Sequence, residues 1–149
     1  MFEFGTVYWK QGQAKYNSPE QHFLVVLAID EENKQVWYQT LSSHIEHIFQ
    51  FPAAGRPHID VDAVAFLNYQ KYSYLSKDTC IVMMHGVNKE NKSVFEQNVQ
   101  SGTYKLKGKI INHNKKSVLL SLKCATEHKL SEYERMQIVR HYTNCETRS

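Results

Sequence analysis

The stretch His22-Phe-Leu-Val-Val-Leu-Ala-Ile29 is a nearly unbroken run of apolar residues. It is too short for a typical helix and rich in β-branched residues, which predicts a central strand buried on both faces. Residues 30–34, Asp-Glu-Glu-Asn-Lys, then turn the chain, and Gln35–Thr40 resumes a strand pattern. We therefore expect an antiparallel hairpin at the centre of a sheet.

Further strands are predicted on both sides of this hairpin. The segment Phe2–Trp9 alternates aromatic and β-branched residues around Gly5, a glycine that permits a bend or the close approach of another backbone. Residues 103–111 also alternate. After the turn residues 112–116 a partner strand is predicted over 117–123, which gives a second hairpin. The complete set of expected strands is 2–9, 22–29, 35–40, 63–69 with an extended segment after it, 79–84, 103–111 and 117–123.

One clear helix is predicted at the C-terminal end. Ser131 and Glu134 have the spacing of a capping box, in which each residue satisfies a backbone N–H near the start of a helix. Shorter helices are expected over 44–49, capped by one of the two preceding serines, and within 89–99. The C-terminal helix carries one apolar stripe that we expect to face the core, formed by Tyr133, Met136, Val139 and Tyr142.

These elements predict a mainly β fold. Successive hairpins with few helices favour a small barrel closed by the amphipathic C-terminal helix, because closure removes exposed strand edges. The alternative is an open α+β sheet with the same helix packed on one face. The chain has 149 residues and no long linker, so a single domain over 1–149 is expected.

The charge balance is mild. Lys and Arg total 18 against 15 Asp and Glu, which gives a net charge of +3, and eight His can add positive charge at lower pH. A dedicated nucleic-acid-binding domain usually carries a denser basic stripe. The composition therefore permits nucleic-acid binding through a local patch and does not require it.

The cysteines and the N-terminus point to the cytoplasm. Cys80, Cys124 and Cys145 are an odd number at wide spacing, which predicts neither a disulfide framework nor a zinc ribbon. The first ten residues lack the layout of a signal peptide, and no segment reaches the roughly 20 apolar residues that a membrane span needs. We expect a cytoplasmic protein without membrane association.

No metal or cofactor is predicted. His44 and His47 could lie on one helical face, with Cys80 and His85 as distant partners, but this spacing matches no established zinc pattern. Cys80 lies inside an apolar strand, where a cysteine is usually a small buried hydrophobic residue and not a nucleophile.

The candidate catalytic residues lie at strand ends. His22 begins the central strand and Ser42 and Ser43 follow its hairpin partner, so they are expected to be neighbours at one rim of the sheet. The turn Lys77-Asp78-Thr79 precedes a later strand. A histidine beside a hydroxyl and a cation has the groups needed for metal-independent proton transfer at an RNA 2′-OH. In the plain structural alternative, His22 only begins a strand, Ser42 caps a helix and the turn is solvated.

A second candidate is an aromatic and basic cluster. Tyr69, Tyr72 and Tyr74 lie next to Lys71 and Lys77 in the sequence. Such a cluster could stack the bases of a single strand while the lysines contact phosphates. The alternative is that alternate tyrosines face the core as ordinary strand residues.

The order of these elements resembles a known toxin family. The segments FGTVYW, HFLVVLAI, TLSS and YSYLSKDTCIVM follow one another as in the toxins PemK, MazF and Kid, which are SH3-like barrels closed by a C-terminal helix. The resemblance is one of pattern and covers most of residues 4–140. It implies an SH3-like barrel of this type, as part of a toxin–antitoxin or phage-defence system.

The resemblance also implies an activity and a set of residues. It implies metal-independent cleavage of single-stranded RNA, with His22 as acid or base where the family commonly carries Arg. Ser42 or Ser43 would position the scissile phosphate, with Lys10 and Lys15 nearby as RNA-binding residues. Tyr72 and Lys77 of the aromatic and basic cluster complete the predicted RNA-binding set. The implied partners are single-stranded RNA, a cognate antitoxin and a second copy joined through a sheet edge or the C-terminal helix.

A different class of function fits the same sequence. The net charge is small, and His22 stands where the toxin family commonly carries Arg. Both features favour a non-catalytic SH3-like module that regulates a protein partner. The face from Tyr69 to Tyr74 would then bind that partner.

Overall fold

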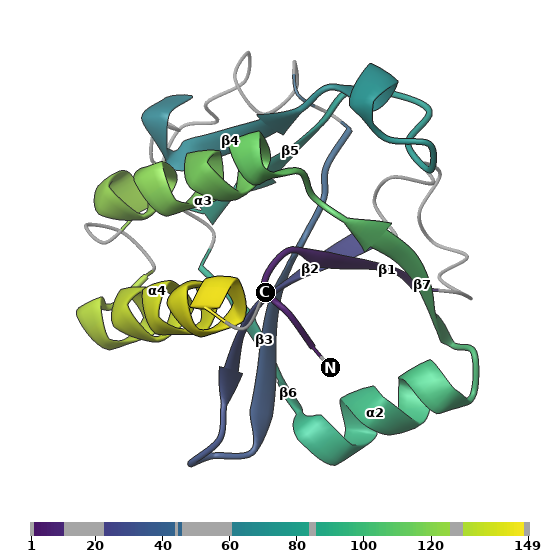
Figure 1. Ribbon diagram of the computed structural model, residues 1–149, viewed down its shortest axis with the longest axis vertical. Coiled ribbons are helices and arrows are strands. Elements are labelled where there is room, and N and C mark those ends of the chain that lie inside the picture. The colour runs from purple at the N-terminus through teal and green to yellow at the C-terminus, as the bar shows by residue number, and fades with distance from the viewer. Residues whose placement is uncertain are drawn as a thin grey trace, which may run out of the picture.

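The computed structural model of the protein describes residues 2–10, 23–43, 45, 61–83, 86–125 and 130–147. In these residues, strands form a five-stranded sheet of order β6-β3-β2-β1-β7 and a two-stranded sheet β4-β5, with helices packed around them (Figure 1). The strands are β1 (Thr6–Lys10), β2 (Phe23–Asp30), β3 (Gln35–Thr40), β4 (Val64–Leu67), β5 (Thr79–Val82), β6 (Asn88–Asn91) and β7 (Tyr104–Lys109). The helices are η2 (Val61–Ala63), η3 (Tyr69–Lys71), α2 (Lys92–Gln100), α3 (Asn112–Ala125) and α4 (Glu132–Thr147).

The fold is a mixed α+β arrangement of antiparallel sheets. The prediction of a closed barrel is wrong for the part of the chain that the structure describes, because β6 and β7 are the two unjoined edges of the larger sheet. The alternative of an open α+β sheet with the C-terminal helix on one face agrees with the structure. Strand β6 was not predicted from its polar sequence, Asn-Lys-Glu-Asn.

The predicted central hairpin is confirmed. β2 pairs with β3 in antiparallel register, and Asp30 closes the turn by accepting hydrogen bonds from the backbone and side-chain N–H groups of Asn33 at 3.1 and 2.8 Å. β2 is buried on both faces, as its apolar sequence predicts: Val25 and Leu27 belong to one core cluster and Leu24 and Val26 to another.

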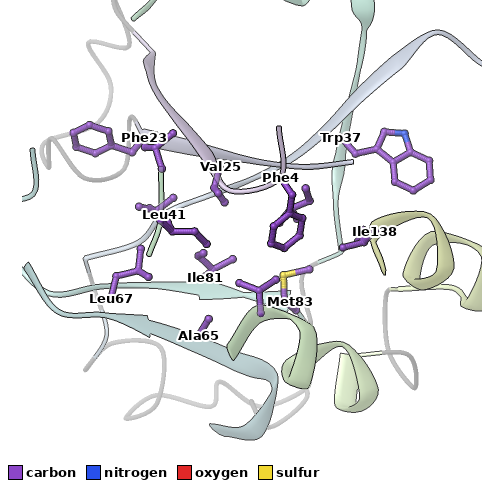
Figure 2. Close-up of a cluster of buried hydrophobic side chains, with 14 of the residues drawn as sticks. Phe4, Phe23, Val25, Trp37, Leu41, Ala65, Leu67, Ile81, Met83 and Ile138 are labelled. Carbon is purple, nitrogen blue, oxygen red and sulfur yellow. The ribbon is translucent and has the colours of Figure 1, made fainter. Parts of the chain in front are cut away.

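The main core lies between the two sheets and the helices α3 and α4. Figure 2 shows Leu41, which follows β3, together with Leu67 of β4 and Ile81 of β5. Ile138 enters from α4 and is fully buried. A side chain of this type contributes about 1.5–3 kcal/mol when it leaves water.

The second core lies between the larger sheet and α2. The ring of Phe95 meets the rings of Phe2, Tyr104 and Tyr8 at centroid distances of 5.1, 5.0 and 5.5 Å. The helix predicted within 89–99 is therefore present as α2 with Phe95 facing inward. Val94, the residue before Phe95, is 45% exposed and lies on the outer side of the helix.

Gly5 permits the close backbone approach that the sequence suggested. Its φ of 86° is in the left-handed region, and an added Cβ would lie 2.9 Å from a side-chain carbon of Ile110. The Gly5 N–H donates to the carbonyl of Val26 at 2.8 Å, and its carbonyl accepts from Ile110 N–H at 2.9 Å. This bend delays the start of β1 to Thr6, four residues after the predicted start.

The predicted second hairpin is wrong. Residues 117–123 lie inside α3, and β7 pairs with β1. Val118 and Leu122 are buried and four residues apart, which is the spacing of one helix face. The same short apolar run fits a strand or a helix, and the packing of α3 on β4 and η2 decides between them.

A buried polar network connects η3 to the start of α3. The hydroxyl of Tyr72 donates to Asn114 Oδ1 at 2.5 Å and accepts from Ile111 N–H at 3.0 Å, while Asn114 Nδ2 donates to the carbonyl of Phe66 at 2.8 Å. The chain after β4 is thus a 3₁₀ turn and a loop, where an extended segment was predicted. Buried polar groups that satisfy one another in this way fix the relative position of their elements.

The capping box that opens α4 is confirmed. Ser131 N–H donates to Glu134 Oε1 at 2.9 Å, and Glu134 N–H donates to Ser131 Oγ at 3.1 Å. The predicted apolar stripe is confirmed in part. Tyr142 packs against the core beside the buried Ile138, and the Tyr133 ring lies 6.1 Å from the Trp37 ring, whereas Met136 and Val139 are 51 and 40% exposed.

One predicted element lies largely outside the described residues. Of the short helix expected over 44–49, only Ile45 is described. Among the helices of the described segments, none combines the length and apolar character required to traverse a membrane.

We predict that Tyr72→Phe destabilises the protein by about 1–3 kcal/mol, because it leaves a buried amide oxygen and a backbone N–H without their partner. Tyr69→Phe is the matched control, since Tyr69 is 42% exposed. Denaturant unfolding of both variants measures the free energies of unfolding. Equal stability of the two variants would contradict the role of the network.

Candidate functional site

The ends of β1, β2 and β3 meet at one edge of the larger sheet, which we call the rim. Trp9 pairs with Phe23, and Leu41 N–H donates to the Phe23 carbonyl at 3.0 Å. Lys10 and Ser42 follow Trp9 and Leu41 and therefore lie at this rim. His22 lies outside the described residues, so its position next to Ser42 stays a prediction.

Ser42 joins the two sheets. Its N–H donates to the carbonyl of Cys80 at 3.0 Å, and Cys80 N–H donates to the carbonyl of Ser42 at 2.9 Å. The bridge is antiparallel, so Ser43 continues toward Thr79 and the turn before β5. The structure thus brings the two predicted serines close to the turn that contains Lys77.

The turn before β5 is held by a side chain. Asp78 Oδ1 accepts a hydrogen bond from Tyr69 N–H at 3.0 Å, which ties the turn to η3. Lys77 is exposed, whereas Thr79 is fully buried. Lys77 is thus a charged group free to meet solvent within three residues of the bridge at Cys80.

The three tyrosines predicted as a stacking cluster have different environments. Tyr72 is 5% exposed and its hydroxyl is used in the buried network, so the prediction that it contacts RNA is wrong for this arrangement. Tyr74 packs on Phe23 with ring centroids 5.9 Å apart, and its hydroxyl donates to the carbonyl of Lys109 at 3.3 Å. Tyr69 alone keeps a substantially exposed ring.

The hydrogen bond from the Tyr74 hydroxyl to the Lys109 carbonyl places the segment between β4 and β5 beside β7. In Figure 1 this teal segment lies at the same side of the molecule as the end of β7. Tyr74 also lies against Gly108, where an added Cβ would be 3.2 Å from the ring. The segment that carries the predicted RNA-binding residue Lys77 and the strand β1 therefore lie on one side of the molecule, with β7 between them.

Strand β7 supplies basic residues that the sequence interpretation missed. It is an edge strand paired only with β1 among the described strands, and its Lys105 and Lys107 are exposed. Lysines on an edge strand are a common protection against edge-to-edge aggregation. The signal was present as alternate lysines in Tyr104–Lys109, but the position of this strand beside β1 was not predictable.

An aromatic ring and a cation meet across β1 and β7. Trp9 pairs with Lys105, whose Nζ lies 5.8 Å from the centre of the Trp9 ring, and Lys10 pairs with Tyr104. We call Trp9, Lys105 and Lys107 the β1–β7 surface, because Lys10 follows Trp9 on the strand and its side chain points to the opposite face of the sheet. Its indole ring with neighbouring ammonium groups has the chemistry of a site for a nucleic-acid base and its phosphates.

The ion pairs of the described residues lie elsewhere. Glutamates pair with Lys89, Lys92, Lys109, Lys115 and Arg135, and none of these ion pairs includes Lys77 or a lysine of the β1–β7 surface. The small net charge of the whole chain is therefore compatible with a local excess of positive charge on this side of the molecule.

Cys80 is fully buried in β5. Burial raises the pKa of its thiol to about 11, so the thiol stays protonated near neutral pH. In the described segments, no group of three His, Cys, Asp or Glu residues is arranged to hold a metal ion. The predicted ligand candidates His44, His47 and His85 lie outside those segments, as does the predicted RNA-binding residue Lys15.

The sequence matches no known family model and no curated protein. The function has to be inferred from the site itself.

Proposed function

We propose that the protein binds single-stranded RNA on the β1–β7 surface and cleaves it at the neighbouring rim without a metal ion. The observation that carries this proposal is the position of Lys105 over the Trp9 ring, with the exposed Lys107 on the same strand. A single strand presents unpaired bases to an aromatic ring and phosphates to cations, whereas a duplex hides its bases.

The rim would supply the cleavage chemistry. His22, which precedes β2, would take the proton of a ribose 2′-OH as the 2′-oxygen attacks the adjacent phosphorus. The bond from phosphorus to the 5′-oxygen then breaks, this oxygen takes up a proton, and a 2′,3′-cyclic phosphate remains. Ser42 or Ser43 would position the phosphate, and Lys77 would stabilise its added negative charge.

The alternative of a non-catalytic module has less support. It depended on a protein-binding face from Tyr69 to Tyr74, and the rings of Tyr72 and Tyr74 are largely used inside the fold. A cytoplasmic RNA substrate and a cognate antitoxin remain part of the proposal through the resemblance to the PemK, MazF and Kid toxins.

We predict that Lys105→Gln with Lys107→Gln weakens binding of a short unstructured RNA and lowers its salt dependence. Each phosphate contact on a single strand contributes about 0.7 to the slope of log K against log salt concentration, so losing two contacts should lower the slope by about 1.4. Fluorescence anisotropy titrations over a range of salt concentrations measure both quantities.

The matched control is Lys34→Gln with Lys116→Gln, which removes the same charge from exposed positions outside the surface. If the control pair lowers affinity and slope as much as the β7 pair, binding depends on net charge alone and the proposed surface is wrong.

We predict that the purified protein cleaves single-stranded RNA in the presence of EDTA and that His22→Ala slows cleavage by about 10²–10⁴-fold, the usual contribution of a general acid or base. A single 2′-deoxy nucleotide at the cleaved position should block the reaction, because the attacking oxygen is missing. Gel analysis of end-labelled RNA measures both effects. Ser42→Ala should also slow cleavage, and Ser117→Ala is its control.

RNA that is bound but stays intact with the unaltered protein would refute the cleavage step while leaving the binding surface in place. Cleavage that EDTA abolishes would refute the metal-independent mechanism.

A further inference from the structure

A cavity of about 270 Å³ lies where the residues before β1 pass the last turn of α4 (Figure 1). Its lining includes a thiol, an imidazole and charges of both signs, from Glu3, Glu31, Lys92, His141, Asn144 and Cys145. A second hollow of about 290 Å³ adjoins it, shares Glu31, His141 and Asn144, and adds Arg140. Each is close in size to the smaller ligand sites of proteins, which span about 300–1,000 Å³. The site contains no residue of the β1–β7 surface, so it is independent of the proposed RNA binding.

Two N–H groups point at the sulfur of Cys145. The Phe4 N–H donates to Cys145 Sγ at 3.4 Å, and His141 Nε2 lies 3.7 Å from the same sulfur. His141 Nε2 also lies 2.8 Å from the Phe2 carbonyl, and because a carbonyl only accepts, this nitrogen carries the hydrogen. Both donors would stabilise a negative charge on the sulfur. The thiolate, and not the thiol, is the nucleophile in thiol–disulfide exchange.

The charges around Cys145 favour a ligand that carries carboxylates and an ammonium group. Arg140 is exposed and forms no ion pair with the described residues. Lys92 has a 3.5 Å contact to Glu31, whose side chain is 77% exposed. The two cations suit the carboxylates of a ligand, and Glu31 suits its ammonium group. A small peptide disulfide such as oxidised glutathione carries these groups around an S–S bond.

We propose that Cys145 is a thiol–disulfide exchange site for a small peptide disulfide of the glutathione class, which the cavity binds through its charged groups. The Cys145 thiol loses its proton to water, and the thiolate attacks one sulfur of the ligand. The S–S bond of the ligand breaks as a new bond forms to Cys145 Sγ. The other half of the ligand leaves as a thiolate and takes up a proton. Cys145 is thereby oxidised to a mixed disulfide, and the departing half is reduced to a thiol.

Mass spectrometry of the folded protein incubated with oxidised glutathione tests the site. We expect one glutathionyl group to be added, peptide mapping to place it on Cys145, and Cys145→Ser to abolish it. Cys80 is the internal reference for a thiol that stays unmodified, because it is fully buried. The absence of an adduct, or an adduct on another cysteine, would overturn the proposal.

The ligand class is tested by comparing oxidised glutathione with the neutral hydroxyethyl disulfide. Lys92→Gln with Arg140→Gln should slow the reaction with oxidised glutathione about threefold or more and leave the reaction with the neutral disulfide unchanged. Lys107→Gln with Lys116→Gln is the matched control, since it removes the same charge from exposed positions outside the cavity. Equal effects of the two pairs, or equal effects on the two disulfides, would show that the cavity does not select a charged ligand.

The contribution of His141 is tested by its pH dependence. His141→Leu removes one N–H donor, which lowers the thiolate population about tenfold, and the higher nucleophilicity of the remaining thiolate reduces the loss of rate to about threefold. At a pH that ionises the thiol in both proteins, the variant should react at least as fast as the unaltered protein. His141→Gln keeps an N–H donor and should retain most of the rate, while circular dichroism checks that each variant is folded. A rate that falls by the same factor at every pH would contradict this role of His141.

Discussion

Two backbone hydrogen bonds between Ser42 and Cys80 connect the larger sheet to the smaller one, and much of the structure depends on this bridge. It continues β3 beyond Thr40 onto β5 and so brings Leu41 and Ile81 into one core. α3 and α4 can then cover a single apolar interior instead of two separate sheets (Figure 1). The bridge also fixes where the rim lies, because the residue that joins the sheets is the one that follows the central hairpin.

The correctly predicted elements are those whose sequence pattern fits only one structure. β2 is apolar on both faces, and only a central strand can bury both. The capping box of Ser131 and Glu134 is a local interaction that needs no tertiary contact. Gly5 was expected to permit a close approach, which the contact with Ile110 provides.

The wrong predictions concern segments for which two structures satisfy the same pattern. The run after residue 116 has buried residues at positions 118 and 122, and its helix packs on β4 and η2, which are distant in sequence. α4 has apolar residues on several sides, and its packing against Phe4 and Trp37 decides which of them are internal. Lys105 and Lys107 were not predicted as site residues because their importance comes from the pairing of β7 with β1.

The candidate site combines local charge with a rim of polar strand ends. Glutamates neutralise several basic residues elsewhere, so the lysines near Trp9 create a positive surface despite the small net charge. Tyr74 keeps the turn that contains Lys77 beside this surface, so in the proposed function the binding and cleavage groups act on the same strand of RNA. The buried Tyr72 has a structural role here, since it positions the segment that carries Tyr69 and Lys77.

Photocrosslinking of a short single-stranded RNA containing 4-thiouridine, followed by mass-spectrometric identification of the crosslinked peptides, locates bound RNA on the protein. We expect crosslinks in the peptides that contain Trp9, Lys105 and Tyr69, and none in α2 or α4. Crosslinks concentrated on α2 or α4, or a protein that forms none at low salt, would contradict the proposed binding surface.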